Sequence, residues 1–360
     1  MIYLGAPALT CPLGDDPSEV HQRMCDGDSG LSEVNHDGTV VQAGVIDHHP
    51  KRDGLTRLES MLIDTVKRSL GQVADLDLAK TQVFVCTTKG NIDLIEGQDD
   101  RVELTRLSSV LQSEFGLAHI PQIISHACIS GIVGVITAAR WIEAGNADHC
   151  IVVGGDLASH FTLSGFLSLH AVSEDRCRPY DESRDGINLG EAAACLVVSK
   201  DKGVFGGDCW QYRGGAINND ANHISGPSRT GEGLHRSIER VFAGQSKSFD
   251  FISAHGTGTV FNDEMESIAF ERSGINHKPV HSLKWYLGHT LGAAGLIETV
   301  IGLECLRKNQ LVASGGFQKL GTSKTLDVIN STQDRPLSSF LKTASGFGGC
   351  NASMLISNAD

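Results

Sequence analysis

Residues 121–145 read PQIISHACISGIVGVITAARWIEAG, and this stretch decides the fold class. Its first residues, PQIISHA, have the apolar and β-branched character of a strand. The remainder, CISGIVGVITAARWIEAG, continues as a helix that ends at Gly145. The next stretch, HCIVVGGD (149–156), predicts another buried strand. This order of strand, small-residue turn, helix and strand is typical of an α/β protein.

The carboxyl-terminal half repeats this order of elements. KPVHSLK (278–284) predicts a strand, TLGAAGLIETVIGLECLRK (290–308) predicts a helix with small residues in its first turns, and LVASGG (311–316) follows. No low-complexity segment or linker separates the halves, so we expect one continuous unit. An internal duplication explains the repetition, but so does the ordinary alternation of α/β proteins, and both explanations stay open at this point.

The composition is that of a large globular chain. Its 360 residues are 40% hydrophobic and 20% charged, which is enough apolar surface for a large core. The formal net charge of -13 argues against a general binder of nucleic acid or of anionic membranes. The first residues, MIYLGAPALTCPLGDD, have no basic region and no long apolar region. We therefore expect no signal peptide, no membrane span and a soluble cytoplasmic protein.

The cysteines and histidines show no zinc signature. The ten cysteines include no CxxC pair, and the fifteen histidines include no HExxH motif, so we expect no metal site. Cysteines scattered through strand-like runs are typical of a reducing compartment. The sequence also lacks a Walker loop, a dinucleotide-binding fingerprint and a GxSxG nucleophile elbow.

The turn SHACISG (125–131) carries the first candidate reactive side chain, Cys128. We expect Cys128 in the first turn of a helix, where free amide groups and the helix dipole would lower the pKa of the thiol. The same amides could stabilise an oxyanion. A buried structural thiol is the commoner role of a cysteine, and the segment alone leaves both interpretations open.

Two histidines stand where predicted strands end. His255 follows the strand FDFISA in a turn with Gly256 and Gly258, where an imidazole can reach a cleft and exchange protons. His289 stands before the predicted helix at 290–308, where the helix dipole favours a neutral imidazole that donates a hydrogen bond. Lys284 precedes it and either holds a carboxylate or is solvated.

Further turns supply hydroxyl groups and an aromatic ring. Thr257 and Thr259 bring two hydroxyls to the turn of His255, which suits a polar chain of amides. Phe347 stands among glycines in TASGFGGCNAS (343–353), either in a tight core turn or as a mobile gate beside a pocket. The charged loop RPYDESRDG (178–186) reads as a solvated loop.

Five segments together resemble the elongating β-ketoacyl-acyl carrier protein synthases of the thiolase-like superfamily. They occur in the family's order and cover most of the chain: ACISG, RPYDESRDG with LGEAAACLVV, AHGTGTVFNDEMES, SLKWYLGHTLGAAG and GFGGCNAS. The resemblance implies a five-layered αβαβα fold with two pseudo-repeated halves in one compact unit. Residues 1–200 would carry the nucleophilic cysteine, and residues 201–360 the two histidines and the lysine.

The resemblance also implies roles for individual residues. Cys128 matches the acyl-accepting nucleophile, and His255 and His289 match the pair that acts on malonyl decarboxylation. Lys284 matches a structural and electrostatic lysine, with Glu266 as its expected salt-bridge partner.

Three further matches surround that set. Thr257 and Thr259 match threonines that contact phosphopantetheine, and Phe347 matches a gating phenylalanine. The backbone amides of Cys128 and Phe347 match the oxyanion hole.

The implied activity is that of an acyltransferase, a 3-oxoacyl-acyl carrier protein synthase. An acyl group on Cys128 condenses with malonyl-acyl carrier protein in a decarboxylative Claisen reaction, which extends a fatty acyl or polyketide chain by two carbons. The implied partners are the acyl carrier protein and a second ketosynthase-like subunit, in a homodimer or heterodimer. No cofactor is implied beyond the phosphopantetheine of the carrier. CTTKGNID (86–93) and ACISG are similar to ketosynthases of aryl polyene and flexirubin pigment pathways.

Two alternatives remain beside this interpretation. One is a chain-length-factor-like partner subunit of a ketosynthase heterodimer, although the intact cysteine and histidines favour an enzyme. The other is a thiolase that uses Cys350, although that cysteine follows its glycine run instead of preceding it. Lys51, Arg52 and Arg57 are weak candidates for docking an acidic carrier protein.

Overall fold

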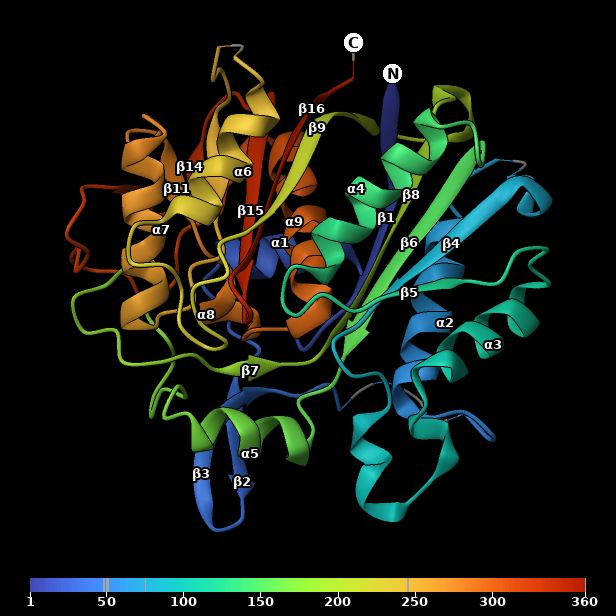
Figure 1. Ribbon diagram of the computed structural model, residues 1–360, viewed down its shortest axis with the longest axis horizontal. Helices are drawn as coiled ribbons and strands as arrows, with labels where there is room; N and C mark the ends of the chain where they lie inside the picture. The colour runs from blue at the N-terminus through green and yellow to red at the C-terminus, as the bar shows by residue number, and fades with distance from the viewer. Residues whose placement is uncertain (48, 50–51, 75, 245, 360) are drawn as a thin grey trace.

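The fold is organised around one eleven-stranded sheet (Figure 1). The structure is a computed structural model that describes residues 1–47, 49, 52–74, 76–244 and 246–359. In the sheet, the strands lie in the order β13-β11-β10-β15-β16-β9-β1-β8-β6-β4-β5. The two halves of the sheet join where β1 pairs antiparallel with β9.

Both halves have the same strand order. The amino-terminal half contains β1 (Ile2–Thr10), β4 (Thr81–Cys86), β5 (Gln122–Ile124), β6 (His149–Asp156) and β8 (Ala192–Ser199). The carboxyl-terminal half contains β9 (Cys209–Asn219), β10 (Phe251–Ser253), β11 (Pro279–His281), β15 (Ser339–Gly346) and β16 (Cys350–Asn358). Numbered by appearance within each half, these five strands lie in the order 3-2-4-5-1 toward the middle of the sheet in both halves, and the two-residue β13 (Asp327–Val328) adds one strand outside β11. The duplication that the sequence left open is therefore present in the fold.

Strand directions repeat as well. In the amino-terminal half β4 runs parallel to β5 and β6, and β8 is antiparallel to β6 and β1. In the carboxyl-terminal half β10 runs parallel to β11 and β15, and β16 is antiparallel to β15 and β9. In each half the segments that follow the parallel strands therefore leave the sheet at the same side, the carboxyl ends of those strands. This is the side where α/β proteins bind their ligands.

The two halves of the sheet form two layers, and helices form three more, which gives the five layers that the resemblance implied. The central layer is α4 (Ser130–Glu143) with α9 (Ala294–Lys308), which contact each other and strands of both halves. The outer layers are α2 (Arg57–Leu70) with α3 (Leu104–Phe115) on one side and α6 (Glu232–Phe242) with α7 (Val260–Arg272) on the other, as Figure 1 shows. The predicted boundary at 200/201 falls between β8 and β9.

Two glycines set the distance between the central helices. A Cβ at Gly131 of α4 would lie 2.8 Å from the backbone nitrogen of Leu296, and a Cβ at Gly295 of α9 would lie 2.8 Å from that of Ile132. Real side chains do not approach a backbone so closely, so only glycine fits at either position. The small residues that begin both predicted helices therefore bring the two helix starts together.

Smaller elements surround this framework. They are α1 (Pro17–Cys25), α5 (His160–Ser168), α8 (Lys284–Leu287), β2 (Ser32–His36), β3 (Thr39–Gly44), β7 (Leu189–Gly190), β12 (Gln310–Leu311), β13 (Asp327–Val328), β14 (Gln333–Asp334) and the 3-10 turns η1 (Leu78–Lys80), η2 (Ile92–Gly97), η3 (Asp100–Val102), η4 (Lys202–Val204) and η5 (Leu291–Ala293). None of the described helices is long and apolar enough to cross a membrane.

Candidate active site

Cys128 lies in a tight turn between β5 and α4. The Ser130 hydroxyl accepts a hydrogen bond from the His126 amide at 2.8 Å and donates one to the Ala127 carbonyl at 2.7 Å. Ala127 has a left-handed φ of 46°, which is uncommon for a residue with a Cβ. Helix α4 begins at Ser130, so Cys128 precedes the helix and is not in its first turn as the sequence predicted.

The thiol of Cys128 is buried, and it is neutral at ordinary pH. Burial raises its pKa to about 12, although the positive charges of Lys89 and Lys284 lower it. The predicted lowering of this pKa is therefore wrong, because desolvation of the thiolate outweighs the nearby positive charges. Cys128 lines two cavities, of about 500 Å³ and about 330 Å³.

His255 and His289 face each other in the larger cavity beside Cys128. Their rings meet edge to face, with centroids 5.2 Å apart and an interplanar angle of 86°. Both imidazoles are buried. Burial and the charge of Lys284 hold both pKa values well below the ordinary value of 6.5. Two neutral imidazoles and one thiol therefore meet in one cavity.

The hydrogen-bond partners of the two rings differ. The Lys284 ammonium lies 3.5 Å from Nδ1 of His255. Because an ammonium has no lone pair, Nδ1 is the acceptor, and the proton of neutral His255 is on Nε2. Neither ring nitrogen of His289 has a partner within the described parts of the chain, although both are buried. Such unpaired groups are uncommon in folded proteins and indicate a ligand-binding role.

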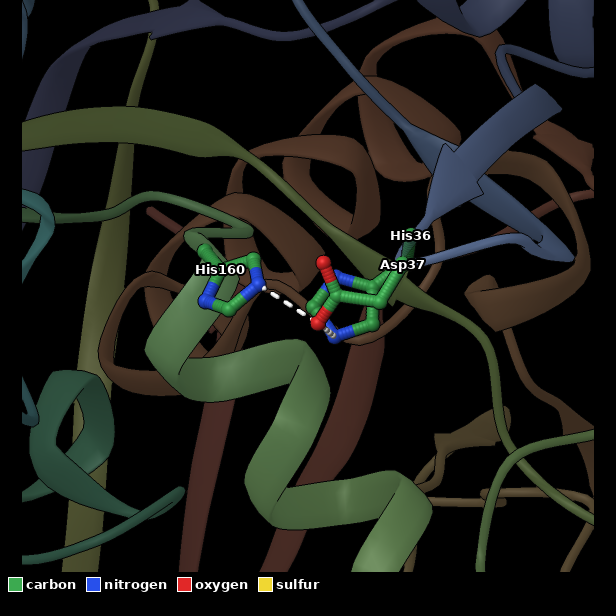
Figure 2. Close-up of side chains that lie close together, drawn as sticks. All are labelled: His36, Asp37 and His160. Carbon is green, nitrogen blue, oxygen red and sulfur yellow. Dashed lines mark hydrogen bonds and ion pairs between the residues drawn. The ribbon is translucent and has the colours of Figure 1, made fainter.

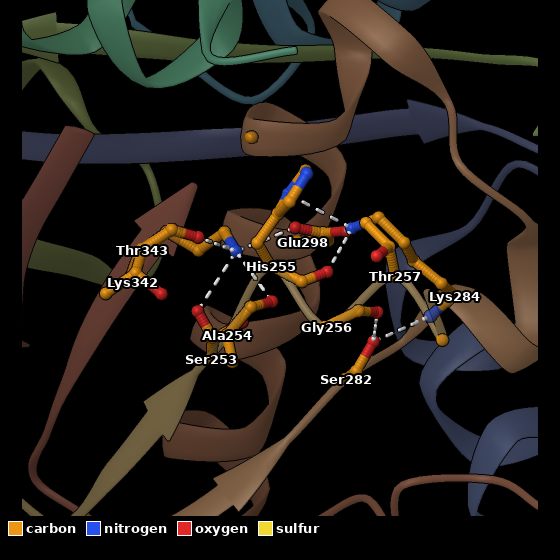
Figure 3. Close-up of polar contacts among 12 residues, drawn as sticks. Ser253, Ala254, His255, Gly256, Thr257, Ser282, Lys284, Glu298, Lys342 and Thr343 are labelled. Carbon is orange, nitrogen blue, oxygen red and sulfur yellow. Dashed lines mark hydrogen bonds and ion pairs between the residues drawn. The ribbon is translucent and has the colours of Figure 1, made fainter. Parts of the chain in front are cut away.

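A buried ionic cluster supports His255 from below (Figure 3). The Lys284 ammonium donates to the His255 carbonyl at 2.5 Å and to Glu298 Oε1 at 2.7 Å. The other Glu298 oxygen pairs with Lys342 at 2.7 Å, and Lys342 also donates to the carbonyls of Ser253 and Thr343. Two buried lysines thus share one carboxylate below His255.

The expected ion pair between Lys284 and Glu266 is wrong, because Glu298 of α9 takes that position. Glu266 of α7 instead accepts from the backbone amides of His255 at 2.9 Å and Gly256 at 2.7 Å, and from the hydroxyl of Tyr180 at 3.0 Å. The carboxylate is buried, and burial raises its pKa. Glu266 therefore fixes the backbone of the histidine turn.

Asp263, one helical turn before Glu266, fixes the next part of the same turn. It accepts from the amides of Thr257 at 2.9 Å and Gly258 at 3.2 Å, and from the amide of Tyr180 at 2.7 Å. Tyr180 is fully buried, and Asp181 is buried beside it. The loop 178–186 is thus packed against the histidine turn at these residues, and the interpretation of it as a solvated loop is wrong.

The remaining predicted side chains line the same cavities. Thr257 and Thr259 both line the larger cavity, and their hydroxyls lie 2.8 Å apart. Phe347 lines both cavities and is 40% exposed, and its ring stacks on Phe166 with centroids 5.5 Å apart. A Cβ at Gly346 would lie 3.1 Å from the Cys128 nitrogen, so the turn that carries Phe347 packs closely on that amide. The pantetheine, gate and oxyanion-hole roles stay predictions.

Four residues of the site were not predicted from the sequence. They are Glu298, Lys342, Phe166 and Lys89, and the last two line the smaller cavity. Glu298 and Lys342 do have a sequence signal, because each is a charged residue inside an otherwise apolar helix or strand segment. Such residues are buried only when they are paired.

One cluster outside the site has the ligand types of a metal centre (Figure 2). The ligand atoms of His36, Asp37 and His160 lie within 4.8 Å of one another. His160 Nε2 is 2.9 Å from Asp37, its Nδ1 is 3.2 Å from Glu96, and these carboxylates raise its pKa. His36 Nε2 is 2.9 Å from the Ser164 hydroxyl. The cluster is an ion-paired network that fastens the start of α5 to the β2–β3 hairpin.

The two arginines predicted as candidates for carrier docking are paired with carboxylates. Arg52 pairs with Asp64, and Arg57 donates to Glu191 at 2.9 Å. Lys51 lies outside the described residues. Both arginines are therefore held by carboxylates of this chain, which weakens their candidacy.

The fold and the site together define a thiolase-like protein, with a cysteine in one half and two histidines in the other. The family model of the β-ketoacyl synthase N-terminal domain matches residues 105–203, and that of the C-terminal domain matches residues 211–318. The two models together match more than half of the chain. The chain belongs to the β-ketoacyl synthase family.

Similar proteins agree with this assignment. The chain is 32% identical, over 64% of its length and 60% of the relative, to 3-oxoacyl-[acyl-carrier-protein] synthase 2 of Coxiella burnetii. It is 28% identical, over 71% of its length and 64% of the relative, to a polyketide biosynthesis malonyl-ACP decarboxylase of Bacillus subtilis. These matches span less than two thirds of the relatives' own length.

A solved structure matches the whole chain. A ketosynthase in complex with its chain length factor from Xenorhabdus doucetiae is similar with a TM-score of 0.90 and 26% identity, covering 99% of this chain and 98% of that one.

Proposed function

We propose that the chain is a β-ketoacyl-acyl carrier protein synthase that extends a carrier-bound acyl chain by two carbons. The observation that carries the proposal is His289, a buried neutral imidazole with no partner on either ring nitrogen in the described chain, in one cavity with Cys128. It is a hydrogen-bond donor prepared for a ligand oxygen, close to a nucleophile. That combination suits condensation of an acyl thioester with an enolate.

Acyl transfer to Cys128 is the first half of the proposed reaction. The sulfur bonds to the carbonyl carbon of the carrier thioester, the carbon–sulfur bond to pantetheine breaks, and the pantetheine sulfur takes the thiol proton. Thr257 and Thr259 hold the pantetheine arm with their hydroxyls. The amides of Cys128 and Phe347 donate to the carbonyl oxygen as it becomes an oxyanion.

Decarboxylation and condensation follow. The bond between the malonyl carboxylate and its α-carbon breaks, carbon dioxide leaves, and the electron pair enters an enolate whose oxygen accepts from His255 Nε2–H and from His289. The α-carbon then attacks the acyl carbonyl on Cys128, and the Cys128 thiolate leaves. The electron pair comes from the substrate, so we expect no metal or redox cofactor. Buried donors that need no reorganisation are effective stabilisers of such an enolate.

The proposed partners follow from the reaction and from similar proteins. An acyl carrier protein delivers both substrates, and a second ketosynthase-like subunit completes a homodimer or heterodimer in the cytoplasm. The similar structure from Xenorhabdus doucetiae contains a ketosynthase with its chain length factor. The similarity of CTTKGNID (86–93) and ACISG to ketosynthases of aryl polyene and flexirubin pigment pathways supports the proposal that the acyl substrate belongs to such a pathway.

The main test is intact-mass analysis of the protein after incubation with hexanoyl-acyl carrier protein. We expect one hexanoyl adduct on wild type and on Cys350→Ala, and none on Cys128→Ala. Retention of the adduct in Cys350→Ala separates a synthase from a thiolase that depends on Cys350. With malonyl-acyl carrier protein, His289→Asn should keep the hexanoyl adduct and lose carbon dioxide release. Wild-type protein that remains unmodified, alone and with its partner subunit, would favour the chain-length-factor-like alternative.

A further inference from the structure

Lys89 occupies a rigid turn at the carboxyl end of β4. The Thr87 hydroxyl donates to Asp156 at 2.7 Å, and the Thr88 amide donates to the same buried carboxylate at 2.8 Å. Asp156 also accepts from the Gly292 amide at 2.7 Å, in the loop that follows His289. One carboxylate therefore fixes the Lys89 turn against the histidine loop.

The same turn forms a wall of the smaller cavity, which is otherwise mostly apolar. That cavity of about 330 Å³ is lined by Cys128 and by the rings of Phe161, Phe166 and Phe347. Lys89 is the one charged residue that lines it among the described residues. The larger cavity contains the threonines expected to hold pantetheine, so an acyl group on Cys128 has the smaller cavity available to it.

Lys89 has no carboxylate partner within the described chain. Its ammonium donates to the Thr88 hydroxyl at 2.8 Å, whereas both buried lysines below His255 pair with Glu298. Its positive charge reaches the site, since it is the largest of the charge effects on Cys128. Holding an ammonium against an apolar wall is unfavourable unless an acceptor oxygen pairs with it. Lys89 is half-buried, and among the described residues the acceptor that its ammonium contacts is the neutral Thr88 hydroxyl, so a ligand oxygen in the cavity can pair with this charge in place of solvent.

We propose that Lys89 is a specificity-determining residue, which selects acyl groups that carry an acceptor oxygen remote from the thioester over plain hydrocarbon acyl groups. The oxygen belongs to a carboxylate or to a phenol. The inference rests on the proposed function, because it assumes that the acyl group is attached to Cys128. Pairing with an ammonium strengthens a hydrogen bond about twofold over a neutral pair, which makes Lys89 a strong discriminator.

The test compares acyl-pantetheines of matched size. The first pair is adipoyl and hexanoyl, with six carbons each, and the second pair is 3-(4-hydroxyphenyl)propanoyl and 3-phenylpropanoyl. Dissociation constants are measured on Cys128→Ala protein, and acylation rates are measured on protein with the thiol. In at least one pair, we expect Lys89 to favour the oxygen-bearing member about tenfold or more. The pair that shows the preference identifies the oxygen as carboxylate or phenol.

Three variants complete the design. Lys89→Met should bring the preference close to one, and Lys89→Arg should keep it because the charge remains. Lys200→Met removes an exposed ammonium outside both cavities and should leave the preference unchanged. Equal affinities within both pairs, or the same preference in Lys89→Met as in wild type, would overturn the proposal. Equal affinities within both pairs would be the result if an acidic residue of a partner subunit, and not the acyl group, paired with Lys89.

Failure of the proposed function is recognised separately. If no acyl group modifies Cys128 while Cys128→Ala protein still discriminates within a pair and Lys89→Met does not, the synthase proposal fails and the Lys89 subsite stands. If hexanoyl modifies Cys128 and neither pair is discriminated, the Lys89 proposal alone fails.

Discussion

The two halves of the molecule have one strand order and supply different chemistry from corresponding places. The segment after β5 carries Cys128 and leads into α4, while the segment after β11 carries His289 and leads into α9. The turn after β4 carries Lys89, and the turn after β10 carries His255. The shared topology therefore fixes where reactive residues can stand, and the local sequence decides what they do.

The means of holding the two reactive turns also differ. Backbone strain at Ala127 and the Ser130 hydroxyl shape the cysteine turn. The histidine turn depends on carboxylates and ammonium groups, with Glu266 bound to its amides and Lys284 bound to its carbonyl. Electrostatic support is concentrated beside the imidazoles, whose pKa values are lowered first by burial and then by the charge of Lys284. Three tests by substitution separate the ionic, packing and titration parts of this comparison.

Removing the charge of Glu298 should have the largest effect. In Glu298→Gln, the buried ammonium groups of Lys284 and Lys342 lose their shared counter-charge, so we expect the free energy of unfolding to fall by about 3–5 kcal/mol. Urea denaturation measures the loss. The control is Glu114→Gln, whose carboxylate and whose partner Lys67 are both partly exposed, where we expect less than about 1 kcal/mol. Equal losses in the two variants would show that the buried cluster contributes no more than a surface pair.

The same cluster shows which features of the site can be predicted from the sequence and which cannot. The turns of Cys128, His255 and His289 could be located from the sequence because small residues interrupt apolar strand and helix patterns there. The partner of Lys284 could not, since both Glu266 and Glu298 are available in the sequence and only the packing of α9 between the two halves of the sheet decides between them. The five layers came from the family resemblance. The pKa of Cys128 was misjudged because a sequence does not report burial.

Adding a methyl group at the glycine contact between the central helices should have the second-largest effect on stability. In Gly131→Ala or Gly295→Ala the new methyl group meets the backbone of the other helix at about 2.8 Å, and we expect a loss of about 2 kcal/mol in unfolding free energy. Either loss would occur despite the higher helix propensity of alanine. Gly165→Ala in α5 is the control, because nothing lies within 4 Å of its Cβ position, and it should be neutral or stabilising. Stability gains in all three variants would contradict the close contact.

The smallest expected effect concerns His281, which ends β11 where Ile124 ends the corresponding strand β5. Burial lowers the pKa of His281 to about 4 from 6.5, so between these pH values the unfolded chain binds a proton that the folded chain does not. Stability from this residue is therefore lost as the pH falls below 6.5, by about 1.4 kcal/mol at pH 5.5. His281→Asn lacks this titration, and its side-chain amide can still donate to the Val312 carbonyl that His281 Nδ1 contacts at 3.0 Å. The difference in unfolding free energy between wild type and variant should shrink by that amount from pH 7.5 to 5.5. Because both proteins contain the same buried carboxylates, taking the difference between their unfolding free energies cancels the titration of those groups. A difference that is the same at both pH values would mean that His281 is not held neutral in the folded protein.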